Sequence, residues 1–123
     1  MEDIIAKTGA EVIIADAKEH DEAVALISHM PLLMSQALFK TAKNSELAMR
    51  LASSGFRDMT RLCMSNLEMA KDMREYNGKN ITKSVDVLFK TLFELNTPDD
   101  IQDFVEIKEA RQKMYSEDGK NIL

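Results

Sequence analysis

Hydrophobic residues occupy nearly every side of residues 23–39 when this segment is drawn as a helix. A helix with one face in water shows a polar stripe at a period of about 3.6 residues, and this segment shows almost none. We therefore expect the central buried helix of a bundle or a helix shared with a second subunit. Five positions interrupt the apolar runs: Ser28, His29, Pro31, Ser35 and Gln36. Because no run approaches the roughly 20 residues that a bilayer requires, we expect no membrane span.

Pro31 lies in the middle of this apolar segment. Its missing N–H and its ring disturb a helix on the preceding turn, so we expect a kink near residues 28–30. Carbonyl groups freed at a kink need partners, which makes Ser28 and His29 candidates for a site. A core helix that tolerates a proline has the same pattern, and helix geometry does not choose between the two.

Two helical stretches are expected after the apolar segment, each preceded by a residue that favours helix N-termini. Asn44 or Ser45 caps a short helix over residues 46–52, which ends before Gly55. Asp58 is the expected N-cap of the turn that follows.

A further helix is expected over residues 67–76. Asn66 is its expected cap, and Asn77 with Gly78 is expected to break or kink it. Beyond this point hydrophobic residues recur at intervals of three and four, which predicts an amphipathic helix. These residues are Ile81, Val85, Leu88, Leu92 and Leu95.

The sharpest expected boundary is Thr97-Pro98, where threonine would cap the last helix and proline would be its first residue. The last helix is predicted to turn its hydrophobic residues inward and to fray from residue 116 onward. These hydrophobic residues are Ile101, Phe104, Val105 and Ile107.

The N-terminal end does not fit the helical pattern. Residues 1–8 are expected to end a helix at Gly9, a usual residue after a helix C-terminus. Residues 11–15 form a β-branched run typical of a strand, yet no other segment is predicted to pair with it. The strand would pair with a copy in another chain or with a sheet that is not in this sequence. We favour the missing sheet, which would make the chain a fragment.

Composition agrees with one all-α domain, a helical bundle with a single stray strand. The chain has 123 residues, with only four glycines and two prolines. A net charge of −5 argues against nucleic-acid binding. The lone cysteine, Cys63, cannot form an internal disulfide, and the N-terminus has no basic, apolar leader, so we expect the cytoplasm.

Neither histidine has the partners that a metal site or a catalytic triad needs. His20 and His29 are nine residues apart, without a cysteine or carboxylate cluster beside them. His29 is expected to bond a backbone group at the kink, and His20 with Asp21 to cap a helix start. Cys63 lies among apolar residues and is expected to pack there.

Residues 53–61 carry the most informative cluster. Gly55 allows a turn, Asp58 can cap, and Arg57 and Arg61 project from the start of a helix. Guanidinium groups beside free helical N–H groups form a good carboxylate receptor, with bidentate geometry. Two solvated arginines in surface ion pairs would have the same pattern.

The chain resembles a known family through an ordered set of short motifs: His20-Asp21, Ser28-His29-Met30-Pro31, Gly55-Phe56-Arg57-Asp58-Met59-Thr60-Arg61, and then Ser65 and Asn77. It is similar to the helical C-terminal domain of prephenate and arogenate dehydrogenases. That family has His-Asp, then Ser-His-Leu-Pro-His, then a glycine-rich turn before Phe-x-Asp-x-Thr-Arg. The resemblance runs from about Gly9 to the end of the chain.

The resemblance implies a bundle like the C-terminal domain of 6-phosphogluconate dehydrogenase, and a homodimer. The family oxidises and decarboxylates prephenate to 4-hydroxyphenylpyruvate, or oxidises arogenate, with NAD or NADP on the route to tyrosine. The resemblance implies that Arg61 holds a substrate carboxylate, that Gly55 and Arg57 line the pocket, and that His29 lies near the same cleft.

The resemblance also implies that catalytic and cofactor-binding residues lie in a Rossmann domain outside these residues, since the chain has no G-x-G-x-x-G. Residues 1–15 would connect to it, residues 16–115 would form the dimerisation and substrate domain, and residues 116–123 a tail. The chain alone would not catalyse the reaction.

Two departures from the family pattern bear on the pocket. Leu32 stands where the family has its second histidine, which would remove a polar group. Ser53-Ser54-Gly55 replaces a run of glycines, so backbone approach to a ligand is less assured. The choices between prephenate and arogenate, and between NAD and NADP, stay open.

Two other functions fit the same residues. One is a free-standing, non-catalytic helical dimer that binds tyrosine or a related aromatic acid. The other is a purely structural helical dimer in which Arg57 and Arg61 are solvated.

Overall fold

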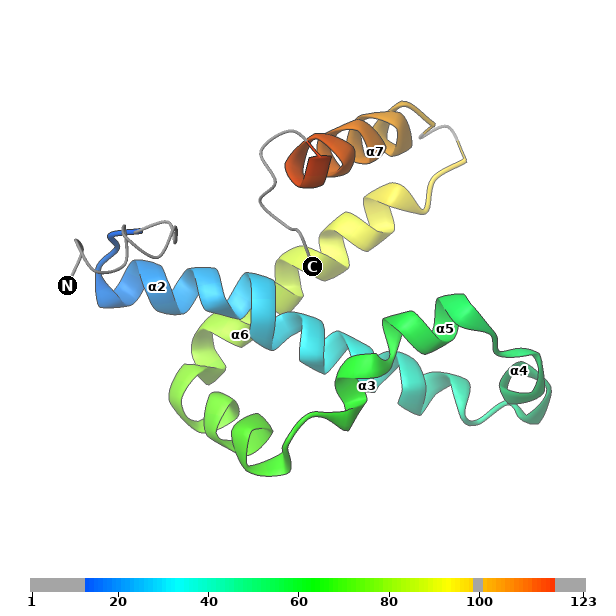
Figure 1. Cartoon of the computed structure of the whole chain (residues 1–123), viewed down its shortest axis with the longest axis horizontal. Coiled ribbons are helices and arrows are strands. Elements are labelled where there is room, and N and C mark those ends of the chain that lie inside the picture. The colour runs from blue at the N-terminus through cyan, green and yellow to red at the C-terminus, as the bar shows by residue number, and fades with distance from the viewer. Residues whose placement is uncertain (1–12, 99–100, 117–123) are drawn as a thin grey trace. The chain divides into compact units, whose positions relative to one another are not determined.

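The computed structural model describes residues 13–98 and 101–116, and the described residues form helices and connections without a strand (Figure 1). The elements are α2 (Ala17–Val24), the π-helical turn η1 (Ala25–His29), α3 (Met30–Ala42), α4 (Glu46–Leu51), α5 (Ser54–Met59), the 3₁₀ turn η2 (Arg61–Met64), α6 (Leu67–Leu95) and α7 (Ile101–Ser116). The all-α prediction is confirmed. The chain divides into two compact units, with the boundary between Val85 and Asp86, within α6.

The predicted strand at residues 11–15 is wrong over its described part. Ile13, Ile14 and Ala15 are exposed and lie outside any regular element, and residues 13–98 and 101–116 contain no strand that could pair with them. Residues 11 and 12, and the helix predicted over residues 1–8, lie outside the described residues.

The helix disturbance predicted before Pro31 is present as the turn η1. The Met30 N–H donates to the carbonyl oxygen of Ala25, five residues back, so the turn holds one residue more than an α-helical turn. A proline ring collides with the carbonyl four residues before it, here that of Ile27. A wider turn is a usual way to relieve such a collision, and α2, η1 and α3 follow one another without a break.

The N-cap of α2 is Asp16, whose Oδ1 accepts a hydrogen bond from the Glu19 N–H at 2.7 Å. The capping role predicted for His20 and Asp21 is therefore wrong. Both residues lie within the span of α2. Their exposed side chains contact each other, with 3.4 Å between His20 Nδ1 and Asp21 Oδ1.

Two other caps are as predicted, and one is not. Ser45 Oγ accepts from the Ala48 N–H, and Asn66 Oδ1 accepts from the N–H groups of the second and third residues after it. Asp58 does not cap a helix, because α5 already begins at Ser54 and contains both Gly55 and Asp58.

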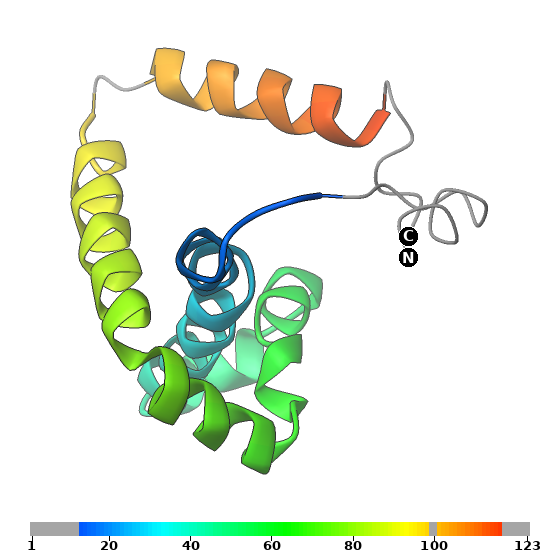
Figure 2. The same ribbon diagram turned by 90° about the vertical axis from the view of Figure 1, so that its left-hand side faces the viewer.

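The kink predicted at Asn77 is present within α6 (Figure 2). Asn77 has φ −126° and ψ 17°, outside the helical range, and the helix resumes beyond it. The boundary at Thr97-Pro98 differs from the prediction. The Thr97 hydroxyl donates to the Glu94 carbonyl at the end of α6, and Pro98 lies in a turn before α7 begins.

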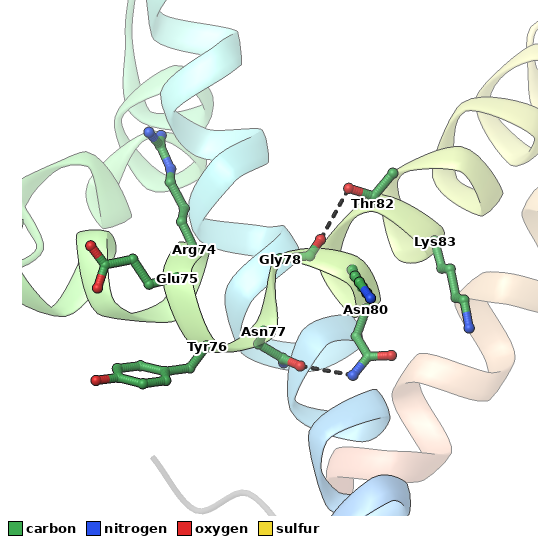
Figure 3. A pocket seen from close by; sticks show the side chains of 9 residues that line it. Arg74, Glu75, Tyr76, Asn77, Gly78, Asn80, Thr82 and Lys83 are labelled. Atoms are coloured by element: carbon green, nitrogen blue, oxygen red, sulfur yellow. Dashed lines mark hydrogen bonds between the residues drawn. The ribbon is translucent and has the colours of Figure 1, made fainter.

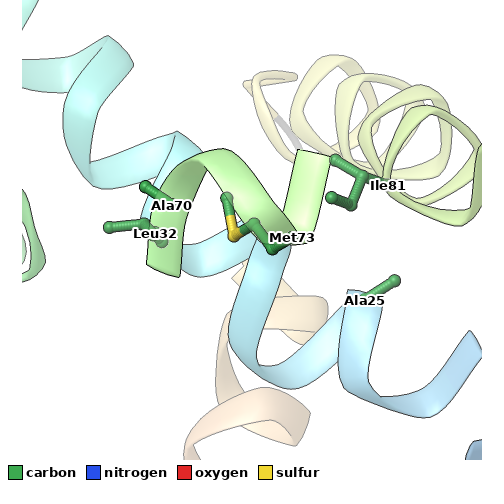
Figure 4. Close-up of a cluster of buried hydrophobic side chains, with 5 residues drawn as sticks. All are labelled: Ala25, Leu32, Ala70, Met73 and Ile81. Carbon is green, nitrogen blue, oxygen red and sulfur yellow. The ribbon is translucent and has the colours of Figure 1, made fainter. Parts of the chain in front are cut away.

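The first unit has a small core between the segment α2–η1–α3 and α6 (Figure 4). Its buried hydrophobic residues are Ala25, Leu32, Ala70, Met73 and Ile81. Leu33 and Val85 pack against them. The kink in α6 lies between Met73 and Ile81, so both halves of that helix contribute to the same core.

Many large hydrophobic side chains stay exposed in the single chain. Those of α7 that were predicted to face inward are between 42% and 73% exposed, so that prediction is wrong within one chain. Residues 17–42 are long and apolar enough to cross a membrane by length and composition, a test that core helices of soluble proteins also pass. Only 17% of the tested window is buried. This segment therefore lacks cover within its own chain.

Replacing Leu32 by alanine is expected to lower the free energy of unfolding by about 2–3 kcal/mol, near the lower end for buried leucines because so small a core can partly collapse. Leu32 is 4% exposed, whereas Leu47 is 63% exposed and serves as the matched control. Leu47→Ala should stay within about 0.5 kcal/mol. Urea unfolding at one protein concentration measures both, and equal effects would contradict this core.

Candidate functional site

Arg57 and Arg61 line an open hollow of about 750 Å³. Arg57 lies in the last turn of α5, and Arg61 is the first residue of η2. The lining residues are Phe39, Ser54, Arg57, Asp58, Thr60, Arg61, Cys63 and Met64. We call this the arginine hollow. The structure thus brings together the two arginines that the sequence singled out, together with Asp58 between them.

The floor of the arginine hollow is fixed by contacts between α3 and the segment α5–η2. The rings of Phe39 and Phe56 stack with centroids 5.8 Å apart. The Cys63 thiol donates to the Ser35 carbonyl at 3.3 Å and lies 3.4 Å from the Ser35 hydroxyl. The Thr60 hydroxyl donates to the Phe56 carbonyl at 2.7 Å, where α5 ends. Cys63 therefore packs η2 onto α3, in agreement with its predicted role.

The lining of the arginine hollow carries an excess of positive charge, because it includes two arginines and one carboxylate residue, Asp58. Across residues 13–98 and 101–116, neither Arg57 nor Arg61 lies within salt-bridge distance of a carboxylate. Within the part of the chain that the structure describes, both arginines are therefore candidates to bind an added anion. Arginine binds carboxylates through two parallel N–H···O bonds, so this surface can hold an organic acid.

Gly55 does not itself line the hollow, although its neighbour Ser54 does. A Cβ atom at Gly55 would meet nothing within 4 Å, so the glycine is not needed there for space. The expected pocket role of Gly55 finds no support in this geometry.

His29 lies away from the arginine hollow and contacts the kink of α6 instead. Its Nδ1 is 3.1 Å from Nδ2 of Asn77, and the same Asn77 nitrogen donates to the Asp21 carbonyl at 2.9 Å. His29 was expected to bond a backbone group, and it bonds a side chain instead. The backbone group bonded at this kink is the Asp21 carbonyl, and its partner is the Asn77 side chain.

Figure 3 shows the kink from outside, with the amides of Asn77 and Asn80 facing each other. Asn80 Nδ2 donates to Asn77 Oδ1 at 2.8 Å. An open hollow of about 720 Å³ lies at this kink, lined by residues 74–80, 82 and 83. We call the contacts of Asp21, His29, Asn77 and Asn80 the asparagine clasp.

Leu32, at the position of the family's second histidine, belongs to the core and not to a pocket. Among the residues that the structure describes, no cluster of three or more metal-binding side chains occurs.

Sequence reasoning missed Phe39 and Ser35 as supports of the arginine hollow and Asn77 as the partner of His29. Phe39 and Ser35 read as ordinary positions of an apolar helix, since contacts across 17 or more residues leave no local pattern. A polar residue at a predicted kink was the available signal for Asn77.

Comparison with known proteins assigns this chain to a family. Residues 16–112 match the family model described as "Prephenate dehydrogenase, dimerization domain". The matched residues cover α2 to the greater part of α7 and include both arginines and the asparagine clasp. The chain is therefore a helical domain of the dimerising class, and it belongs to the prephenate dehydrogenase family.

Individual relatives agree. The chain is 28% identical over 101 residues to a prephenate dehydrogenase of Bacillus subtilis (strain 168), covering 79% of this chain and 27% of that protein. It is 42% identical over 57 residues to a prephenate dehydrogenase of Lactococcus lactis subsp. cremoris (strain MG1363), covering 43% of this chain and 16% of that protein. The chain thus spans about a quarter, or less, of the length of these relatives.

A solved structure shares the fold. The crystal structure of Synechocystis arogenate dehydrogenase matches with a TM-score of 0.70 and 31% identity. The match covers 92% of this chain and 43% of that one. The fold resemblance to prephenate and arogenate dehydrogenases expected from the motifs is confirmed.

Proposed function

We propose that this chain is the dimerisation and substrate domain of a prephenate or arogenate dehydrogenase. The observation that carries the proposal is the arginine hollow within a domain of this family. Prephenate and arogenate are acids with carboxylate groups, and Arg57 and Arg61 line this hollow without a carboxylate partner among residues 13–98 and 101–116. Arg61 holds the carboxylate, with Arg57 beside it.

The oxidation requires NAD or NADP, and this chain has no glycine-rich phosphate-binding turn. In the proposed enzyme a nucleotide-binding domain of the same polypeptide holds the cofactor, and residues 1–15 connect it to the helical domain of residues 16–115. This domain then contributes substrate binding and dimer contacts, and the 123 residues alone do not transfer hydride. A reducing cytoplasm suits the single thiol of Cys63.

The proposed assembly is a homodimer. Exposed hydrophobic side chains recur along α2–η1–α3, α6 and α7, among them Ile27, Leu67 and Phe93, each more than 70% exposed. Monomeric proteins rarely leave so many large hydrophobic residues uncovered. A second copy covers them, which agrees with the match to a family described as a dimerization domain.

Calorimetric titration of the full chain with prephenate, arogenate and tyrosine tests the binding role. We expect prephenate or arogenate to bind, and no NAD(P)H to form when NAD or NADP is added. Failure of both acids to bind would contradict the substrate role. Binding of tyrosine alone would favour the free-standing module that binds an aromatic acid.

Reading the coding DNA in frame upstream of Met1 tests the domain organisation. An upstream nucleotide-binding domain with a glycine-rich turn agrees with the proposal. A start codon at Met1 with nothing in frame before it would contradict it and favour the non-catalytic module.

A further inference from the structure

Asn77 is a buried polar residue at a backbone position that a helix does not favour. The residue is 8% exposed, and its φ and ψ interrupt α6 between two core residues, Met73 and Ile81. A buried amide costs free energy unless its hydrogen bonds are made. The asparagine clasp supplies them from three separate places in the chain: Asp21, His29 and Asn80.

The surroundings fix which way the Asn77 amide points. A backbone carbonyl oxygen only accepts hydrogen bonds, so the Asn77 atom 2.9 Å from the Asp21 carbonyl is the nitrogen. The opposite atom, 2.8 Å from Asn80 Nδ2, is the oxygen and accepts from it. Reversing the Asn77 amide would set its oxygen against the Asp21 carbonyl oxygen and lose that bond.

The orientation of Asn77 in turn fixes the proton on His29. The Asn77 nitrogen, a donor, lies 3.1 Å from His29 Nδ1. A ring nitrogen that accepts a hydrogen bond carries a lone pair, and neutral imidazole then has its proton on Nε2. Within residues 13–98 and 101–116, Nε2 of the half-buried His29 has no hydrogen-bond partner.

We propose that Asn77 is a positioning residue that holds His29 in the Nε2–H form, so that this N–H donates to an oxygen of the bound acid. This inference rests on the proposed function for the ligand, but not for the tautomer. His29 does not line the arginine hollow, so an acid held there by Arg61 has to extend beyond the hollow for a second oxygen to reach the His29 Nε2–H. The clasp thus selects a ligand with an acceptor at this point and disfavours one with a donor.

Nitrogen NMR of the imidazole rings in the ¹⁵N-labelled full chain tests the tautomer. At about pH 8, where ordinary imidazole is neutral, we expect His29 to show an unprotonated Nδ1 and a protonated Nε2. His20→Gln removes the only other histidine and assigns the signals. A protonated Nδ1 in the unaltered chain would overturn the proposal.

Asn77→Asp replaces the donor with an acceptor, and we expect the His29 proton to move to Nδ1. Asn44→Asp makes the same chemical change at an exposed asparagine and should leave the ring unchanged. If Asn77→Asp does not fold, as judged by circular dichroism, Asn77→Ala removes the donor and is expected to give both tautomers. A His29 pattern that stays the same in the folded Asn77 variant would overturn the role of Asn77.

Titration with prephenate and arogenate tests the donor role separately. We expect Asn77→Asp to weaken binding of the acid that the unaltered chain prefers by about five- to tenfold, the effect of one lost hydrogen bond. Unchanged binding, with the proton moved, would overturn the donor role. If the unaltered chain binds neither acid, the proposed function and the donor role both fail, while the NMR result still decides whether Asn77 sets the tautomer.

Discussion

Arg61→Gln is expected to weaken binding of prephenate or arogenate to the chain by about ten- to a hundredfold. A hydrogen bond to a charged group contributes about 1.5–3 kcal/mol, and Arg61 offers its guanidinium to the arginine hollow without a carboxylate partner among the described residues. Glutamine keeps a polar side chain of similar reach but loses the charge and the fork. Calorimetric titration of the folded variant measures the change in Kd.

Two further variants separate charge from geometry. Arg61→Lys keeps the positive charge without the planar fork, so an intermediate loss is expected. Arg50→Gln removes the same charge from α4, outside the lining of the hollow, and should change Kd by about twofold or less. If Arg61→Gln binds as the unaltered chain does, Arg61 is not the carboxylate receptor.

The sequence predicted those features that depend on neighbouring residues. Ser45 and Asn66 lie immediately before apolar runs, and such positions determine caps through contacts two or three residues away. Pro31 has no N–H in any fold, so a disturbed turn before it follows from the chain itself. Asn77 beside Gly78 marked the kink for the same local reason.

The features that the sequence did not predict depend on distant contacts or on two similar local choices. Asp16 and Asp21 both suit an N-cap, and the structure begins α2 after the first of them. Asp58 also has a capping side chain, yet α5 starts four residues earlier. For His29, the local pattern suggested a backbone partner, whereas the actual partner is 48 residues away.

The candidate site was likewise predicted from the sequence only in part. Arg57 and Arg61 were recognised because they lie four residues apart in one motif, and the structure places both at one hollow. Gly55 and His29 belong to the same family motifs, yet neither lines it. A motif records that residues occur together in a family, and only the packing of α3 against η2 and α6 separates those that share a surface from those that do not.

Ile27→Asp is expected to convert a dimer of this chain into monomers at micromolar concentration. Ile27 is 78% exposed on the apolar segment α2–η1–α3, one of the three exposed hydrophobic regions that the proposed second copy covers. Burying one isoleucine contributes about 1.5–3 kcal/mol. A two-fold interface contains each residue twice, so the change removes about 3–6 kcal/mol and raises the dissociation constant by about a hundredfold or more. Light scattering and sedimentation measure the mass.

Ile13→Asp is the matched control, because it makes the same change at a residue that is 79% exposed and lies before α2. It should leave the dimer intact. A monomer mass for the unaltered chain would contradict the homodimer, and a dimeric Ile27→Asp would move the contact away from α2–η1–α3 to the exposed residues of α6 or α7. Ile27 is outside both the core and the arginine hollow, so monomers of this variant should keep their helices. Their affinity for prephenate would then show whether one chain alone holds the acid or whether the site needs both.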